Sequence, residues 1–171
     1  MEITVKGYNT LKGCGGDAGI QKNDNVSTGT LTITAEDTNQ TLNVSADTTV
    51  VLPLADRMDI DDGSHGTKNI EIKGGTVNTQ GRIGSGWNGG SAENIVITGD
   101  AVVNANGGIG GGEVEGYNLN KGRKTSITIS GNAKVNATDK VDNGYSSNAS
   151  LAVIGGGYGD TAEMPSPAMQ M

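Results

Sequence analysis

Four aspartates and the single histidine of the chain gather in the stretch "LADRMDIDDGSHGTK", between Leu54 and Lys68. Carboxylate oxygens at close spacing are the ligands that Ca²⁺ prefers in proteins. We therefore predict a calcium-binding site at these aspartates that has no catalytic role. The spacing does not fit an EF-hand loop, because the glycine comes one residue early and Ile70 stands where the bidentate glutamate belongs. A solvated acidic loop with a turn at Asp62-Gly63 is the alternative. The candidate ligands are Asp56, Asp59, Asp61 and Asp62.

Aromatic side chains are the second group with binding chemistry, since sugar rings stack on exposed aromatic faces with polar groups around them. The chain has one tryptophan, four tyrosines and no phenylalanine. Trp87 stands between "IGSG" and "NGGS", which predicts a loop. Tyr117 and Tyr145 lie in two insertions close to Asn and Gly. We predict that Trp87, Tyr117 and Tyr145 contact a glycan; packing of the loops against the scaffold is the alternative for all three.

The elements that must position these residues come from an internal repeat. Three segments share one pattern, at residues 69–86, 94–112 and 126–140. Each begins with two isoleucines separated by one polar residue, which is strand periodicity. A glycine follows, then a second short strand that ends in Val-Asn, then a glycine phrase such as "GIGGG" at 108–112. The step from Ile70 to Ile95 is 25 residues. Degenerate copies precede these, at Ile3/Val5 with Leu11, and at Leu31/Ile33 with Leu42/Val44 and Val50/Leu52.

Short strands in groups of three, with glycine corners, predict an all-β fold, a single-stranded parallel β-helix of about four to five turns with loop insertions. One turn cannot bury its apolar face alone, whereas stacked turns build a continuous core. The recurring Asn78, Asn104 and Asn136 predict an internal amide ladder at a bend. The "GIGGG" phrase is interpreted as a corner of the repeat. A phosphate-binding loop would need a following helix or a Lys-Ser/Thr pair, and neither follows.

The phrases "GYNTLKGCGGDAGI" (7–20) and "IVITGDAVVNANGGIGGG" (95–112) resemble Gly-rich repeats of large surface proteins of gut and other Gram-positive bacteria. This resemblance covers most of residues 3–160. It implies a right-handed, pectate-lyase-like parallel β-helix in an extracellular, cell-surface adhesin or carbohydrate-binding protein. The chain departs from the pattern in the acidic stretch at 56–66 and in the insertions at 113–125 and 138–150. The function expected from the resemblance is non-catalytic adhesion or glycan binding.

Two other functions remain as alternatives. A structural solenoid, such as a phage spike or a filament-forming protomer, would use the same stack and associate with copies of itself. A polysaccharide lyase or hydrolase would need carboxylates and a base on one face. The hydrolases of this fold use an Asp pair, Gly-His-Gly and Arg-Ile-Lys, but here Ser64 precedes His65 and Gly84 follows Arg82-Ile83. No acidic residues recur at the turn spacing to hold a catalytic cation.

The amino-acid composition limits the classes of partner that the chain can bind. The net charge of −7 disfavours nucleic acid and anionic membranes, which both need Lys/Arg clusters. The single cysteine excludes an internal disulfide and a Cys-rich metal site. No apolar run is long enough to insert into a membrane.

We expect residues 1–160 to form the β-helix domain. We expect residues 161–171, which hold two of the three prolines, to be a flexible C-terminal tail or linker. A solenoid also needs caps, and none is evident at the C-terminal end, so we expect either one slice of a longer protein or a protomer that stacks on other copies of itself.

Overall fold

The structure, a computed structural model, describes residues 1–13, 19–20, 29–45, 58–60, 67–84, 91–111, 124–138, 153–156 and 161–163. For 58–60, 67 and 161–163 it describes the backbone alone. These residues form strands and turns and no helix, which confirms the all-β prediction. Accordingly, the described part of the chain holds no helix of the length and apolarity needed to cross a membrane.

The strands lie in three parallel sheets. Sheet A has the order β1 (Glu2–Val5), β3 (Leu31–Ala35), β6 (Thr67–Ile72), β9 (Ala92–Ile97), β12 (Lys124–Ile129) and β15 (Thr161–Glu163). Sheet B has the order β2 (Tyr8–Lys12), β4 (Thr41–Ser45), β7 (Thr76–Thr79), β10 (Val102–Ala105) and β13 (Lys134–Ala137). Sheet C has the order β5 (Met58–Ile60), β8 (Arg82–Gly84), β11 (Ile109–Gly110) and β14 (Ile154–Gly155).

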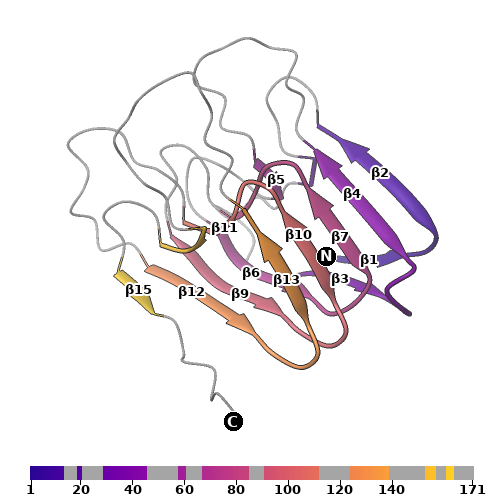
Figure 1. The fold of residues 1–171 in the computed structure, drawn as a ribbon. Helices are drawn as coiled ribbons and strands as arrows, with labels where there is room; N and C mark the ends of the chain where they lie inside the picture. The colour runs from indigo at the N-terminus through magenta and orange to yellow at the C-terminus, as the bar shows by residue number, and fades with distance from the viewer. Residues whose placement is uncertain are drawn as a thin grey trace.

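The chain visits the three sheets in rotation. From β4 onward it passes through sheets B, C and A in turn, so each return places a new strand beside the strand of the previous repeat. Figure 1 shows the result in sheet B, where the strands follow one another from indigo β2 to orange β13. Every neighbouring pair is parallel, as strands joined by a long crossover must be. The arrangement is compatible with a β-solenoid.

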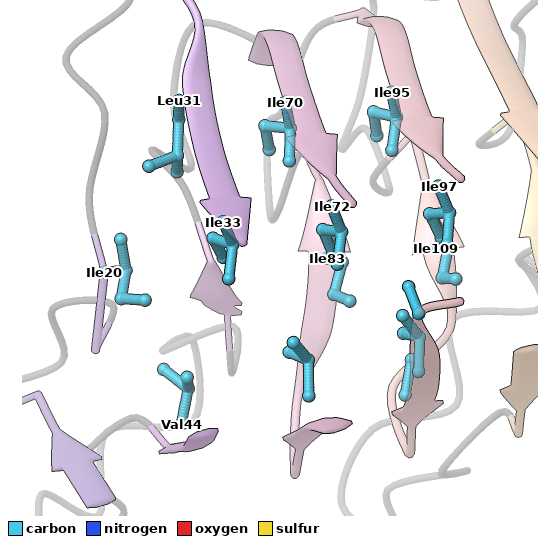
Figure 2. Close-up of a cluster of buried hydrophobic side chains, with 14 of the residues drawn as sticks. Ile20, Leu31, Ile33, Val44, Ile70, Ile72, Ile83, Ile95, Ile97 and Ile109 are labelled. Atoms are coloured by element: carbon cyan, nitrogen blue, oxygen red, sulfur yellow. The ribbon is translucent and has the colours of Figure 1, made fainter. Parts of the chain in front are cut away.

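The apolar pairs predicted from the sequence stack on one another in register. In sheet A, Ile70 pairs with Ile95, which pairs with Ile127, and Ile72 pairs in the same way with Ile97 and Ile129. Leu31 and Ile33 of the degenerate copy extend both columns. Because alternate residues of a strand point to opposite faces, this register directs both columns inward. Figure 2 shows the columns side by side, and their central members are fully buried, namely Leu31, Ile33, Ile70, Ile72, Ile95 and Ile97.

The other two sheets complete the core. In sheet B the column is Leu42, Val77, Val103 and Val135, and in sheet C it is Ile83, Ile109 and Ile154, with the backbone of Ile60 in register beside Ile83. The predictions that Val-Asn ends a second strand and that the glycine phrase forms a third strand are therefore confirmed. The strand of sheet C that follows β4 is β5, at Met58–Ile60, and the sequence analysis did not identify it. Val50 and Leu52 themselves lie outside the described residues.

The glycine phrase stacks as tightly as a backbone allows. Gly84, Gly110 and Gly155 occupy one register position in sheet C, with φ of 131°, 127° and 138°. A Cβ added to Gly110 would lie 2.0 Å from the carbonyl oxygen of Gly155, and one added to Gly84 would lie 2.2 Å from that of Gly110. Only glycine permits both the backbone angle and this approach. The phrase "GIGGG" thus has a structural role in the repeat, but its Ile109-Gly110 pair forms a short strand of sheet C and not the predicted corner.

The last described strand lies just past residue 160. β15 pairs with β12 through Thr161, Ala162 and Glu163, so sheet A continues past residue 160, where we predicted the domain to end. Residues 164–171 of the predicted tail lie outside the described residues, and the flexible-tail assignment stays a prediction.

Replacing Ile97 by alanine tests the stacked core. Ile97 is fully buried between Ile72 and Ile129, and the cavity left behind is lined on both sides by the neighbouring repeats. We expect Ile97→Ala to lower the free energy of unfolding by about 2–5 kcal/mol in urea titrations. The adjacent Val96 is half-buried on the opposite face of β9, and Val96→Ala should cost less than about 1 kcal/mol. Equal losses for the two variants would contradict the assigned register.

Replacing Gly110 by alanine tests the close approach in sheet C. The new methyl group would collide with backbone rather than with a movable side chain, and the φ is strained for any other residue. We expect Gly110→Ala to lower the free energy of unfolding by at least about 3 kcal/mol, followed by circular dichroism in denaturant. Gly7 provides the matched control, since its φ is 72° but nothing lies within 4 Å of its added Cβ. Gly7→Ala should cost about 1 kcal/mol, and a similar loss at Gly110 would refute the stacking constraint.

Candidate functional site

The residues predicted to bind a ligand cannot be placed in space. Six of them lie outside the described residues, and Asp59 lies in β5, of which only the backbone is described. The predicted glycan contacts and the calcium site therefore stay predictions. The six are Trp87, Tyr117, Tyr145, Asp56, Asp61 and Asp62.

Their positions along the chain nevertheless have a common feature, because all of them adjoin sheet C. Trp87 and Tyr117 fall in connections from sheet C to sheet A, after β8 and after β11. Tyr145 falls in the connection from β13 of sheet B to β14 of sheet C. The four aspartates lie in β5 or in the two connections that flank it. By contrast, every connection from sheet A to sheet B is short, at residues 6–7, 36–40, 73–75, 98–101 and 130–133.

The most regular polar feature of the described residues is a ladder of asparagine side chains on sheet B. The Asn104 Nδ2 donates to Asn78 Oδ1 at 2.8 Å, and the Asn78 Nδ2 donates to Asn43 Oδ1 at 2.9 Å. The Asn43 Nδ2 in turn donates to the backbone oxygen of Asn9 at 3.2 Å. The three amides are half-buried, and each occupies the same register position in β4, β7 and β10. We refer to them as the asparagine ladder.

The predicted ladder is thus present but differs in place and membership. It lies on the outer face of sheet B in the middle of the strands, not inside at a bend, because the neighbours Val103 and Ala105 take the inward positions of β10. Asn136 continues the register beside Asn104, yet its side chain is exposed and has no hydrogen-bond partner among the described residues. Asn43, which the sequence analysis did not include, is the third member. Leu42-Asn43 has the same apolar-Asn pattern as the Val-Asn pairs of the later repeats, and this pattern could have revealed Asn43 from the sequence.

Sequence reasoning missed a second amide pair on sheet A. Asn69 and Asn94 each precede the Ile-x-Ile pair of their repeat, and both have left-handed φ, of 60° and 58°. The Asn94 Nδ2 donates to Asn69 Oδ1 at 2.8 Å, and the Asn94 backbone N–H donates to Ser126 Oγ at 2.7 Å. Asparagine adopts this conformation more readily than most residues, which explains its recurrence there. The repeated "NI" before the first strand of each copy is the signal that could have revealed it.

Arg82, which the hydrolase comparison brought to attention, is nearly buried, with 5% of its surface exposed. Its Nε donates to the carbonyl oxygen of Gly110 at 3.3 Å, and its Nη1 donates to that of Gly107 at 3.0 Å. Both acceptors belong to the next repeat. The guanidinium thus ties two successive corners of sheet C together and is not presented to a polymeric substrate.

The described residues offer little catalytic or metal-binding chemistry of other kinds. Among them, no three His, Cys, Asp or Glu side chains gather closely enough to hold a metal ion. The acidic and basic side chains on sheet A pair locally, with Lys68 Nζ at 3.3 Å from Glu93 Oε1 and Lys73 Nζ at 3.2 Å from Glu71 Oε2. These exposed pairs contribute little to stability. What the described part provides is a regular scaffold with polar outer rows.

The asparagine ladder makes a prediction about stability. The Asn78 amide both donates to Asn43 and accepts from Asn104, so Asn78→Ala removes two hydrogen bonds between repeats. Because the site is half-buried, we expect the free energy of unfolding to fall by about 1–2 kcal/mol in urea titrations. Asn136→Ala is the matched control, since it removes the same side chain from the same register position without a bonded partner, and should change stability by less than about 0.5 kcal/mol. A loss at Asn78 no larger than that at Asn136 would show that the ladder does not stabilise the stack.

The features of the stack described above follow from the structure of this chain alone. Its constant parts are the apolar columns of the three sheets, the glycine column of sheet C and the asparagine ladder. Its variable parts are the connections next to sheet C and the connection at 13–30. In comparisons with known proteins, the chain matches no protein-family model, no curated protein and no solved structure.

Proposed function

We propose that the chain forms a right-handed, single-stranded parallel β-helix of about four to five turns that serves as a non-catalytic, extracellular domain of a bacterial surface protein and binds glycans. The rotation of the chain through sheets A, B and C supports the β-helix. The handedness and the surface location rest on the resemblance to the Gly-rich bacterial repeats.

The observation that carries the proposed function is the unequal distribution of the connections. Connections from sheet A to sheet B are short in every repeat, whereas those that adjoin sheet C vary in length and include three long ones, at 46–57, 111–123 and 138–153. One further long connection, at 13–30, joins β2 of sheet B to β3 of sheet A. In repeat proteins, insertions collect on one side of the stack, and that side is often the binding face. Binding residues on loops that a rigid scaffold positions are a general solution to recognition.

The chemistry carried by these connections suits a glycan. Trp87, Tyr117 and Tyr145 are three of the five aromatic residues of the chain, and each adjoins Gly or Asn. Aromatic faces stack on sugar rings, while amides satisfy the hydroxyl groups around them. Asp59 belongs to β5, Asp56, Asp61 and Asp62 flank it in the sequence, and the four are the proposed ligands of Ca²⁺.

Binding to a panel of plant, host and bacterial glycans tests this function, with Ca²⁺ and with chelator, and with product formation followed in the same wells. We expect saturable binding without cleavage. Replacing Trp87, Tyr117 or Tyr145 by alanine should weaken it by about tenfold or more, because each change removes a stacking surface. Weaker binding after chelation, reproduced by Asp61→Asn with Asp62→Asn, would point to the acidic stretch.

Tyr8 provides the control for these variants. It is the most exposed of the large apolar residues that the structure describes, with 77% of its surface accessible, but it lies on β2 of sheet B. Tyr8→Ala should leave glycan binding unchanged. Cleavage of any polymer would contradict the non-catalytic assignment, and absence of binding across the panel would contradict the glycan assignment.

A structural role through self-association is the second candidate function. It is favoured by a specific observation, the position of the exposed apolar side chains at the two ends of the stack.

A further inference from the structure

In the part of the chain that the structure describes, the exposed large apolar residues lie in the first and last repeats. Among the described residues five large apolar side chains are exposed: Met1, Tyr8 and Leu11 in the first repeat, and Ile129 and Val153 in the last. In the repeats between them, the corresponding inward positions of sheets A and B are filled by buried side chains such as Val44, Ile72 and Ile97. At the two ends of the described stack, Leu11 and Ile129 thus occupy inward register positions and are exposed, whereas Tyr8 stands on the outer face of β2.

Both ends also present strand edges. β2 and β13 are the outer strands of sheet B in the described part, and β1 is an outer strand of sheet A. At the C-terminal end, β15 pairs with Lys124, Thr125 and Ser126 of β12, and this pairing ends before Ile127. Exposed strand edges are templates for pairing with another chain, particularly where flanking side chains are apolar.

We infer that a second copy of this chain docks head to tail, with β1 and β2 of one copy adding to β12 and β13 of the other. This inference rests on the proposed β-helix and is independent of glycan binding. The occupant follows from the repeat itself. The first and last repeats follow the same pattern, and each repeat in the chain stacks on the one before it. The first repeat of a second copy can therefore stack on the last repeat of this chain in the same way.

Continuing the register by one repeat gives specific partners. Thr41, Thr76, Val102 and Lys134 share the register position of Tyr8, and their backbone N–H groups donate to the carbonyl before the equivalent residue of the preceding repeat. The distances are 2.8 Å (Thr41 to Gly7), 2.8 Å (Thr76 to Gln40), 2.9 Å (Val102 to Gly75) and 2.8 Å (Lys134 to Ala101). One step further, the Tyr8 N–H of a second copy meets the carbonyl oxygen of Ala133.

Sheet A gives a consistent fit. The same continuation sets Ile3 of the second copy beside Ile129, as Ile3 is set beside Ile33 and Ile97 beside Ile129 within one chain. Glu2 of the second copy then pairs with Thr128, beyond the three residues of β12 that pair with β15. The added β1 and the chain's own β15 therefore do not overlap along β12. On the outer face of sheet B, the exposed Tyr8 ring comes beside the exposed Lys134, a pairing of cation and aromatic ring that favours contact.

Such an interface joins two different surfaces and therefore does not close at a dimer. The first test is sedimentation velocity of the full chain over a concentration series, where we expect the mean size to rise beyond a dimer. Leu11→Lys blocks the N-terminal end and Ile129→Lys blocks the C-terminal end. Both side chains are already 38% exposed, so the variants should fold. Each is expected to raise the concentration needed for half association by about tenfold or more, because an unpaired charge would be buried.

Mixing the two variants provides the decisive readout. Each retains the end that the other has lost, so an equimolar mixture should form one-to-one pairs and stop there. Thr34→Lys, on the outer face of β3 in the middle of the stack, is the control and should associate like the unmodified chain.

Three results would overturn the inference. These are a monomer at every concentration with a retained β-sheet circular dichroism spectrum, a closed dimer that does not grow, or a mixture of the two variants that fails to pair. The first would leave the proposed β-helix standing and indicate that the ends are covered by the chain itself. Loss of the β-sheet spectrum in the unmodified chain would instead contradict the fold on which both proposals rest.

Discussion

The structure depends on register between repeats. An isolated repeat contributes two or three short strands and cannot shield its isoleucines from water, whereas Ile72 and Ile97 become fully buried because the same residue type stands beside each of them. A shift of one residue would turn the column outward and place polar neighbours in the core. Every other feature of the stack either preserves this register or is tolerated because it leaves the register unchanged.

Stacking of equal positions also selects which polar residues can recur. An amide has a donor and an acceptor, so Asn78 can accept from Asn104 and donate to Asn43, and the pattern can continue without limit. A carboxylate repeated at the same position would face its own charge. Glu71 accordingly has Thr32 and Val96 as register neighbours rather than other acids. The same reasoning explains the glycine column, where Gly110 must pass a carbonyl oxygen on the next repeat.

The repeating part of this fold could be predicted because it is written in the sequence several times. The Ile-x-Ile pairs, the Val-Asn pairs and the glycine phrase all took their expected partners. Features outside the repeated pattern were less predictable. β5 stands at Met58–Ile60 because the connection before it, at 46–57, is longer than those at 80–81 and 106–108. The left-handed conformation of Asn69 and Asn94 depends on a backbone angle. The outward position of the asparagine ladder followed from strand alternation and was misjudged. The candidate binding residues belong to connections of unequal length, for which no repeat supplies a template.

Register explains why variation is concentrated next to sheet C. The connections from sheet A to sheet B are held by repeated inter-repeat bonds, such as Thr98 Oγ1 to Ser130 Oγ at 3.0 Å and Asp100 Oδ1 to Asn132 Nδ2 at 3.0 Å, so an insertion there would break contacts with both neighbouring repeats. In sheet C the strands are shorter, and two paired positions, an isoleucine and a glycine, are enough to restore register after an insertion of any length. Long connections can therefore change in sequence and length while the stack persists. A scaffold with this division suits the proposed recognition beside sheet C and, through Leu11 and Ile129 at its two ends, the proposed association along its axis.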